Sequence, residues 1–379
     1  NNRSDDDTVA IVGQYVGRVR NLRIVDALER PSRSYARNVG VKAAHGESIV
    51  FCDADDVVGE GWLAAMGIAL SRFDCVACRV DFTKLNEPAL AQQLPTGFSA
   101  VAGNVALGAN APAGTMNINQ ASERAIAQWQ SFSIGAGGTV NVAQPSRSAV
   151  LLNRVTGADA STIAGSLNAN GHVYLVNPNG VLFSKGSSVS VGGLVASTLD
   201  VSNPSFMAGG KLVFERSDGN SATVVNRGSI NASAGGSVAL MGAQVINEGS
   251  INVARGSVGL VSARTVTVDF DGDGLMRYTI PADPEATAAL VENPAGGSVT
   301  ADGGRIAMLA ASTAKAQVVN QGGVLRARSL ESRNGEIVLG AGLGTGADNP
   351  NGMRISGTVD AGGGETGNGG RVGGRAGNL

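Results

Sequence analysis

Two carboxylates in the stretch "FCDADDVVGEGWLAAM" (residues 51–66) have the types and spacing needed to hold a metal ion. Asp53 and Asp55 close the run "SIVFCDADD", whose apolar residues predict a buried strand, and both side chains point the same way from its end. Two hard oxygen donors suit Mg²⁺ or Mn²⁺ bound to a substrate phosphate. The alternative is a solvated acidic loop, because a bare D-x-D pair often arises by chance.

The three cysteines offer weaker chemistry. Cys75 and Cys78 have the C-x-x-C spacing of redox and zinc sites, but no second pair accompanies them. Cys52 falls inside the predicted strand. We interpret all three as buried free thiols.

The elements around Asp53 and Asp55 alternate between helix and strand. The periodicity predicts helices over 5–18, 34–46 and 61–73, and strands over 22–27 and 48–56. Such alternation is typical of an α/β layer with a mainly parallel sheet, in which ligands bind at the carboxyl ends of strands.

Residues 1–86 resemble the family 2 nucleotide-sugar glycosyltransferases in "NNRSDDDT", "ARNVGVKAAHGESIVFCDADD" and "GWLAAM". The resemblance implies an incomplete GT-A-like α/β fragment, with Asp53 and Asp55 holding Mg²⁺ or Mn²⁺ and the diphosphate of a nucleotide sugar. The family's first two strands and its acceptor-binding half have no counterpart here. Because positioning donor and acceptor supplies much of the rate, we expect no transferase activity.

Composition changes sharply after residue 86. Residues 1–86 hold 23 of the 60 charged residues, all three cysteines and only 7 of the 55 glycines. At 87–91 the small-x-small pair Ala89 and Ala91 resembles the end of a signal peptide, with Gln92 as the first mature residue. An ordinary linker is the alternative. We therefore expect residues 1–86 to be a foreign fragment joined to residues 92–379.

Neither the net charge nor the apolar runs of the sequence favour nucleic acid or a membrane as a partner. A formal net charge of −2 does not favour nucleic acid, and no apolar run reaches the length of a membrane span.

After residue 91 short apolar runs alternate with glycine and asparagine turns, and two units recur. "VVNRGSI" (224–230) returns as "VINEGSI" (245–251) and "VVNQGGV" (318–324), while "GSVALMGA" (236–243) returns as "GSVGLVSA" (256–263) and "GRIAMLAA" (304–311). A period of about twenty residues with short strands predicts a parallel β-helix over 92–345. The recurring Asn226, Asn247 and Asn320 form either an internal ladder or, as we favour, ordinary corners.

Three segments of this part depart from the repeated units. Residues 119–132 fit either a short helix or a strand covering one end of the β-helix. "DFDGDG" (269–274) is not an EF-hand, because Ile280 stands at its twelfth position; a solvated turn or a small insertion is expected. Residues 346–379 are glycine-rich truncated coils, and we expect loose order for "GTVDAGGGETGNGGRVGGRAGNL" (357–379).

The stretch "VYLVNPNGVLF" (173–183) is explained by turn chemistry alone. Pro178 fixes φ at the second turn position, Asn179 tolerates the third and Gly180 supplies positive φ. The tetrapeptide is therefore predicted to be a rigid reversal between two strands.

From residue 94 to about 275 the chain resembles the secretion domain of two-partner-secretion exoproteins, the filamentous haemagglutinin family. The matching elements are "SAVLLNRVTG" (148–157) and "LNANGHVYLVNPNGVLFSKGSSVSVGGLVAST" (167–198). The resemblance implies a right-handed parallel β-helix with an N-terminal cap. It carries the family's secretion elements onto these positions: Asn153, Arg154, Asn177, Pro178, Asn179, Gly180.

By the same resemblance, the partner is an outer-membrane transporter whose periplasmic modules bind the domain. The chain would cross the periplasm of a Gram-negative bacterium, leave the cell unfolded and fold outside as part of a secreted or surface adhesin. The full-length protein would bind a host-cell or surface receptor, and no cofactor is expected. The competing hypothesis is a nucleotide-sugar glycosyltransferase fused to a β-helix.

Overall fold

In a computed structural model of the chain, the residues divide into two compact units, 1–85 and 86–379. The first unit is described at residues 8–16, 18, 22–29, 33–45, 48–51, 66–68 and 70–71. The second is described at 93–109, 111–217, 219–270, 276–280, 290–311, 316–330, 333–342, 351–363 and 368–376. Asp53, Asp55, the cysteines and the predicted junction at 87–91 lie outside these residues.

The described residues of the first unit are helical or irregular. Helix α2 (Arg33–Ala43) confirms the predicted helix over 34–46, whereas α1 (Thr8–Gly13) is shorter than predicted. The predicted strand over 22–27 is wrong, because these residues form no strand. A short strand is stable only beside neighbouring strands, and the described part of this unit supplies none.

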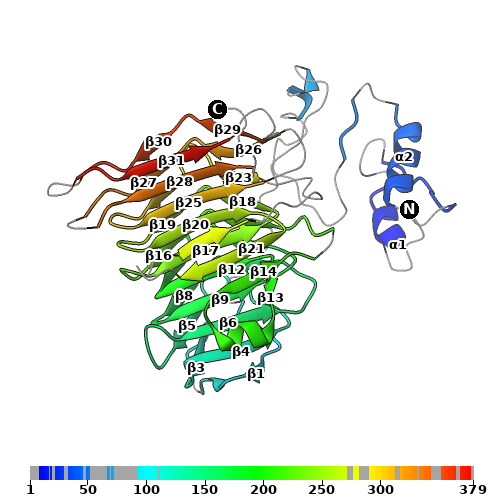
Figure 1. Cartoon of the computed structure of the whole chain (residues 1–379). Coiled ribbons are helices and arrows are strands. Elements are labelled where there is room, and N and C mark those ends of the chain that lie inside the picture. Colours follow the sequence, from blue (N-terminus) through cyan, green and yellow to red (C-terminus); the bar gives the residue numbers. More distant parts are fainter. Residues whose placement is uncertain are drawn as a thin grey trace. The chain divides into compact units, whose positions relative to one another are not determined.

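The second unit is built from coils that each contain three short strands. In one coil β7 (Ser161–Ile163), β8 (Ser166–Ala169) and β9 (His172–Val176) follow one another around the axis. Each strand pairs in parallel with its equivalent in the next coil. Figure 1 shows the coils stacked in chain order, and the described coils of the second unit therefore form a parallel β-helix, as predicted.

Three parallel sheets form the faces of the β-helix. Besides β7, face E contains β10 (Val181–Phe183), β15 (Thr223–Asn226), β18 (Gln244–Asn247), β23 (Leu290–Asn293), β26 (Ala316–Gln321) and β29 (Asn351–Ile355). Besides β8, face D contains β2 (Val105–Leu107), β3 (Thr115–Gln120), β5 (Thr139–Ala143), β11 (Ser188–Val191), β16 (Ser229–Ala232), β19 (Ser250–Asn252), β24 (Ser298–Thr300), β27 (Val324–Arg326) and β30 (Thr358–Asp360). Besides β9, face C contains β1 (Ser99–Ala102), β4 (Arg124–Trp129), β6 (Val150–Val155), β12 (Gly193–Ser197), β17 (Ser237–Gly242), β20 (Ser257–Ser262), β25 (Arg305–Ala310), β28 (Glu336–Ala341) and β31 (Arg371–Arg375).

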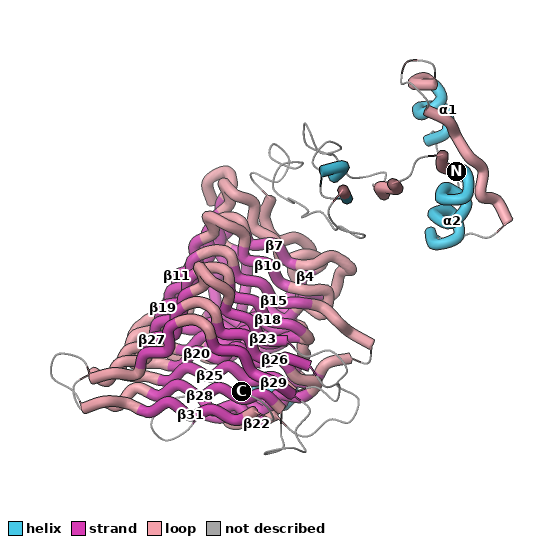
Figure 2. Tube along the Cα trace, turned by 90° about the horizontal axis from the view of Figure 1, so that it is seen from above, coloured by secondary structure: helices cyan, strands magenta, loops and turns pink. Residues whose placement is uncertain are grey.

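Stacked apolar side chains fill the interior of the coils. Figure 2 shows the strands of face E succeeding one another in a single row. Along that row Val181, Val224, Val245 and Val291 are register partners, and all are buried inside. Period-2 alternation sends every second residue inward, so the repeat in the sequence becomes a column in the core.

The first strands close one end of the β-helix. Strand β1 pairs with β4 and β2 pairs with β3, both antiparallel, whereas the coils above them are parallel. Phe98, Trp129 and Phe132 pack edge to face inside this end, with ring centroids 5.1 and 5.3 Å apart. This is the predicted N-terminal cap. Residues 119–132 contribute strands to it, so the helix alternative is wrong.

An internal amide ladder runs up the same interior. Asn226 donates from Nδ2 to Asn247 Oδ1, Asn247 to Asn293 Oδ1, and Asn293 to Gln321 Oε1, each at 2.8 Å. All four side chains are at most 1% exposed. The ladder alternative is therefore confirmed for Asn226 and Asn247. Asn226 also has the favoured corner role, because its Oδ1 accepts from the amide of Gly228 at 3.1 Å.

Asn320 does not belong to the ladder. In the pairing of β26 with β23, Gln321 and not Asn320 stands opposite Asn293, and β26 carries a register shift between Gln317 and Val319 in its pairing with β29. The Asn320 side chain points elsewhere, and its buried Oδ1 has no hydrogen-bond partner. The bulge is consistent with a one-residue offset of "VVNQGGV": the sequence matches the earlier repeats "VVNRGSI" and "VINEGSI", but its asparagine does not occupy the same place in the coil.

A second apolar core lies on the outer side of face C. Strands β13 (Asp200–Val201), β14 (Leu212–Glu215), β21 (Thr265–Phe270) and β22 (Met276–Thr279) form an antiparallel sheet, and helix α5 (Asn203–Ala208) accompanies it. Between this sheet and face C lie residues of both, among them Tyr174, Phe206 and Phe214. Face C is therefore buried on both sides from β4 to β20, which explains the continuous apolar runs of β12, β17 and β20.

The stretch "DFDGDG" belongs to this outer sheet. Strands β21 and β22 pair antiparallel on either side of residues 271–275, which lie outside the described residues. The flanking strands support an insertion, one of the two expected alternatives, while the expected solvated turn lies outside the described residues. Gly259 on β20 makes room for it, since a Cβ there would come within 2.3 Å of the Tyr278 ring.

The glycine-rich tail adds a further coil. Strands β29, β30 and β31 pair in parallel with β26, β27 and β28. An ion pair between Arg328 and Asp360, 2.7 Å long, joins the last two coils on face D. Loose order is therefore the wrong expectation for residues 357–363 and 368–376, because they do have a coil to stack on.

The amide ladder yields a prediction about stability. The substitution Asn247→Ala removes the acceptor of Asn226 and the donor to Asn293, both buried, and should lower the free energy of unfolding by about 1–3 kcal/mol. Urea unfolding followed by circular dichroism measures this. The control Asn252→Ala breaks an exposed amide pair with Asn231 and should stay within about 0.5 kcal/mol. Equal effects of the two substitutions would contradict the role of the ladder.

The outer core yields a prediction about pH. Complete burial raises the pKa of Tyr174 to about 12, although the nearby charge of Arg124 lowers it somewhat. The folded chain then holds a proton that the unfolded chain releases, so stability should fall as the pH rises from about 10 towards 12. Unfolding curves measured across this range should show a shallower fall for Tyr174→Phe than for the wild type. Identical slopes would be the contrary result.

Candidate functional site

The predicted secretion residues lie at the ends of two adjacent strands of face C. Asn153 and Arg154 are near the end of β6, and residues 177–180 come directly after β9. Arg154 of β6 is the register partner of Val176 of β9, and Val176 is the partner of Ser197 of β12. The residues that leave these three strands therefore meet at one corner of the β-helix. We call this the motif corner and define it as residues 153–157, 177–180 and 198–203.

Asn177 shapes the turn from inside. Its side chain is fully buried, and its Nδ2 donates to the main-chain oxygen of Asp159 (2.9 Å) and to Ser161 Oγ (3.0 Å). Its Oδ1 accepts from the amide of Asn179 at 2.9 Å. Every polar atom of the side chain is thus used within the fold, which fixes where the turn begins.

Pro178 and Asn179 form the exposed apex of the turn. Asn179 Nδ2 donates to the main-chain oxygen of Gly157 at 2.8 Å, which links the apex to the preceding coil. Gly180 has φ 120°, as its predicted role requires, and its amide donates to the oxygen of Asn177. The predicted turn is therefore present, but as a corner from face C to face E and not as a reversal, because β9 and β10 pair with strands of neighbouring coils and not with each other.

Asn153 is buried in the end of the β-helix rather than displayed at its surface. Its Oδ1 accepts from Nε1 of Trp129 at 3.0 Å, and the side chain has no exposed area. The residue thus satisfies the polar atom of the largest side chain in the cap.

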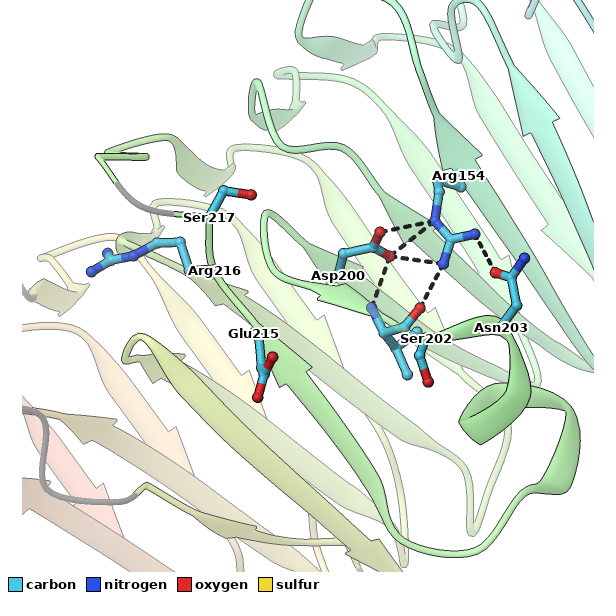
Figure 3. Close-up of a pocket in the computed structure, with 8 residues that line it drawn as sticks. Arg154, Asp200, Ser202, Asn203, Glu215, Arg216 and Ser217 are labelled. Atoms are coloured by element: carbon cyan, nitrogen blue, oxygen red, sulfur yellow. Dashed lines mark hydrogen bonds and ion pairs between the residues drawn. The ribbon is translucent and has the colours of Figure 1, made fainter.

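Arg154 attaches the outer sheet to the corner. Its Nε donates to both carboxylate oxygens of Asp200 (2.9 and 3.1 Å), Nη1 donates to Asn203 Oδ1 (2.5 Å) and Nη2 to the main-chain oxygen of Val201 (2.6 Å). Figure 3 shows this fork of contacts. The arginine side chain is only 12% exposed, whereas that of Asp200 is 54% exposed. A planar guanidinium is suited to such a set of acceptors.

A hollow of about 540 Å³ opens beside this fork. It is lined by polar and charged residues from β6, from the segment around β13 and from the end of β14: Arg154, Asp200, Val201, Ser202, Asn203, Glu215, Arg216, Ser217. In Figure 3 Arg216 and Ser217 lie across the hollow from Arg154. Such a lining suits a polar segment of a protein better than an apolar small molecule.

Sequence reasoning found Asn153, Arg154 and the Asn177–Gly180 turn, but not Asp200 or Asn203. Both lie more than forty residues beyond Arg154, and only the register of the coils brings them together. No local motif marks them.

In the described parts of the chain, no three His, Cys, Asp or Glu side chains lie close enough together to hold a metal ion. Asp53 and Asp55 lie outside those parts, so their predicted role stays a prediction. The described residues also include no helix with the length and apolar character of a membrane span.

Comparison with protein families gives two matches. The model of the TPS (two-partner secretion) secretion domain matches residues 91–360, which is most of the chain. The model of glycosyl transferase family 2 matches residues 1–109.

Two curated relatives are heme/hemopexin-binding proteins of Haemophilus influenzae. One is 44% identical over 115 residues, covering 30% of this chain and 12% of the relative. The other is 49% identical over 86 residues, covering 23% of this chain and 9% of the relative. The matched segments thus span only about a tenth of these relatives.

Among solved structures, the HMW1 secretion domain of Haemophilus influenzae is similar, with a TM-score of 0.57 and 28% identity. The match covers 70% of this chain and 66% of that one. The β-helix, the cap and the family match over 91–360 agree. The chain therefore belongs to the TPS secretion domain family, whose exoproteins cross the periplasm to an outer-membrane transporter and are secreted or displayed at the cell surface.

Proposed function

We propose that the motif corner is the surface that the outer-membrane transporter recognises through its periplasmic modules. One observation carries the proposal: the two secretion elements, around Arg154 and around Asn177, lie on adjacent coils and turn at the same corner. A partner that docks there would touch both at once. The two elements would then be about one coil apart in the sequence because equivalent positions of adjacent coils lie side by side.

The burial of the residues divides their roles. Asn153 and Asn177 are fully buried and would act by shaping the corner. Pro178 and Asn179 are exposed and would contact the transporter. Arg154 would hold Asp200 and Asn203 at the rim of the hollow.

The local character of the contacts is compatible with export of an unfolded chain. In a β-helix each coil contacts mainly its neighbours, so a few coils can form while the rest stays unfolded. The corner needs only the coils of β6, β9 and β12 and the segment that follows. We propose that the transporter binds such a partly folded stretch before the remaining coils form outside.

Export from the source cells tests this proposal. The substitution Asn177→Ala leaves buried hydrogen-bonding groups without partners, at a cost of about 1–3 kcal/mol, and so should lower the exported fraction about tenfold or more. Asn179→Ala, which frees the apex, and Arg154→Lys, which loses the fork, should also lower it. The measurement is the ratio of exoprotein outside the cell to exoprotein in the periplasm.

Matched controls come from coils away from the corner. Asn252→Ala removes an exposed amide pair on face D, and Arg227→Lys alters a single ion pair with Glu248. Both should be exported like the wild type. Normal export of all three corner variants would remove the motif corner from transporter recognition.

We also propose that the full-length exoprotein is an adhesin or haemagglutinin-like protein that binds a host-cell or surface receptor. Family membership supports the exoprotein class. The curated relatives, of which the matched segments span about a tenth, are described as binding heme and hemopexin. Receptor binding would then fall largely outside the secretion domain.

The first 86 residues prompt a separate proposal, namely that they have no glycosyltransferase activity. They match the family, but the secretion-domain match begins at residue 91, where the acceptor half of a family member would follow. The alternative is an active nucleotide-sugar transferase fused to the β-helix.

An assay with nucleotide sugars and Mg²⁺ or Mn²⁺ distinguishes these alternatives. The purified chain should transfer no sugar above background, and Asp53→Asn and Asp55→Asn should change nothing, because half a site cannot align donor and acceptor. Transfer that disappears in Asp53→Asn would establish the alternative.

A further inference from the structure

The loop between β14 and β15 reaches over the exposed apex of the motif corner. Asn220, in this loop, donates from Nδ2 to the main-chain oxygen of Pro178 at 2.7 Å. The two residues are forty-two positions apart in the sequence. The bond therefore joins the apex to a segment that the sequence did not associate with secretion.

The conformation of Asn220 is itself fixed within the loop. Its Oδ1 accepts from the amide of Ala222 at 2.8 Å, and its main-chain amide donates to the oxygen of Ser217 at 3.2 Å. Gly219 precedes it with φ 72°, a backbone conformation that favours glycine. Hydrogen bonds within the loop therefore fix the orientation of the Asn220 side-chain amide that donates to Pro178.

The apex is consequently held from two directions. Asn179 Nδ2 bonds Gly157 of the preceding coil, and Asn220 Nδ2 bonds Pro178 from the following segment. Without the second bond, the Pro178 carbonyl would turn to water, and the apex would keep only the Asn179–Gly157 bond to a segment outside the turn. Arg216 and Ser217 of the same loop also line the hollow opposite Arg154 (Figure 3).

We propose that Asn220 is a positioning residue for transporter recognition, and that its loop forms one wall of the surface the transporter binds. This inference rests on the function proposed for the motif corner. Asn220 sets the orientation of Pro178 and Asn179, while Arg216 and Ser217 complete the rim that Asp200 and Asn203 begin.

The test uses the full-length exoprotein in its own cells and the purified chain in solution. Asn220→Asp keeps the acceptor for Ala222 but loses the donor to Pro178, and Asn220→Ala loses both. The matched control is Asn252→Asp, which loses one exposed amide donor to Asn231. The exported fraction, the melting temperature and the exchange rate of the Gly180 amide are measured for each variant.

Both Asn220 variants should lower the exported fraction by about two- to tenfold, the factor expected when one neutral hydrogen bond is lost. Their melting temperatures should match the wild type, while the Gly180 amide should exchange faster. The control should change none of the three quantities.

Three outcomes would refute either the positioning role of Asn220 or the proposed function of the motif corner, and the measurements distinguish them. Normal export of Asn220→Asp together with failed export of Asn177→Ala refutes the positioning role and leaves the motif corner intact. A fall in export that accompanies an equal fall in melting temperature assigns Asn220 a merely structural role and also refutes the inference. Normal export of the Asn177, Asn179 and Asn220 variants alike refutes the proposed function itself.

Discussion

Hydrogen bonding between successive coils is the interaction on which the rest of this structure depends. Each strand of a coil finds its main-chain partners in the coil before and the coil after, so register is inherited from one end to the other. The cap begins that register with antiparallel strands, and the amide ladder from Asn226 to Gln321 maintains it inside. Residues far apart in the sequence therefore meet because equal positions in each coil stack.

The function that we propose for the motif corner rests on one departure from that regularity. Face C is covered by an antiparallel sheet and helix α5, and Arg154 fastens this cover at the corner where the Asn177–Gly180 turn projects. A plain solenoid would offer the same edge in every coil. Here the cover, the fork and the turn distinguish one corner from all others, which is what recognition by a single partner requires.

Much of this could be predicted from the sequence. The repeated units predicted the coils, the turn residues predicted Gly180 with positive φ, and family resemblance marked Asn153 and Arg154. What depended on register could not be predicted. In the pairing of β26 with β23, Gln321 and not Asn320 stands opposite Asn293, and Asp200, Asn203 and Asn220 reach the corner only through pairing across many residues. The strand predicted over 22–27 failed because periodicity alone cannot supply its neighbours.

The most direct test of the account is amide hydrogen exchange of the chain, measured with and without the periplasmic modules of its transporter. The account predicts added protection at residues 153–157, 177–180 and 219–222, with little change on the strands of face D. Protection confined to the cap or to the last coils, with the motif corner unchanged, would contradict it.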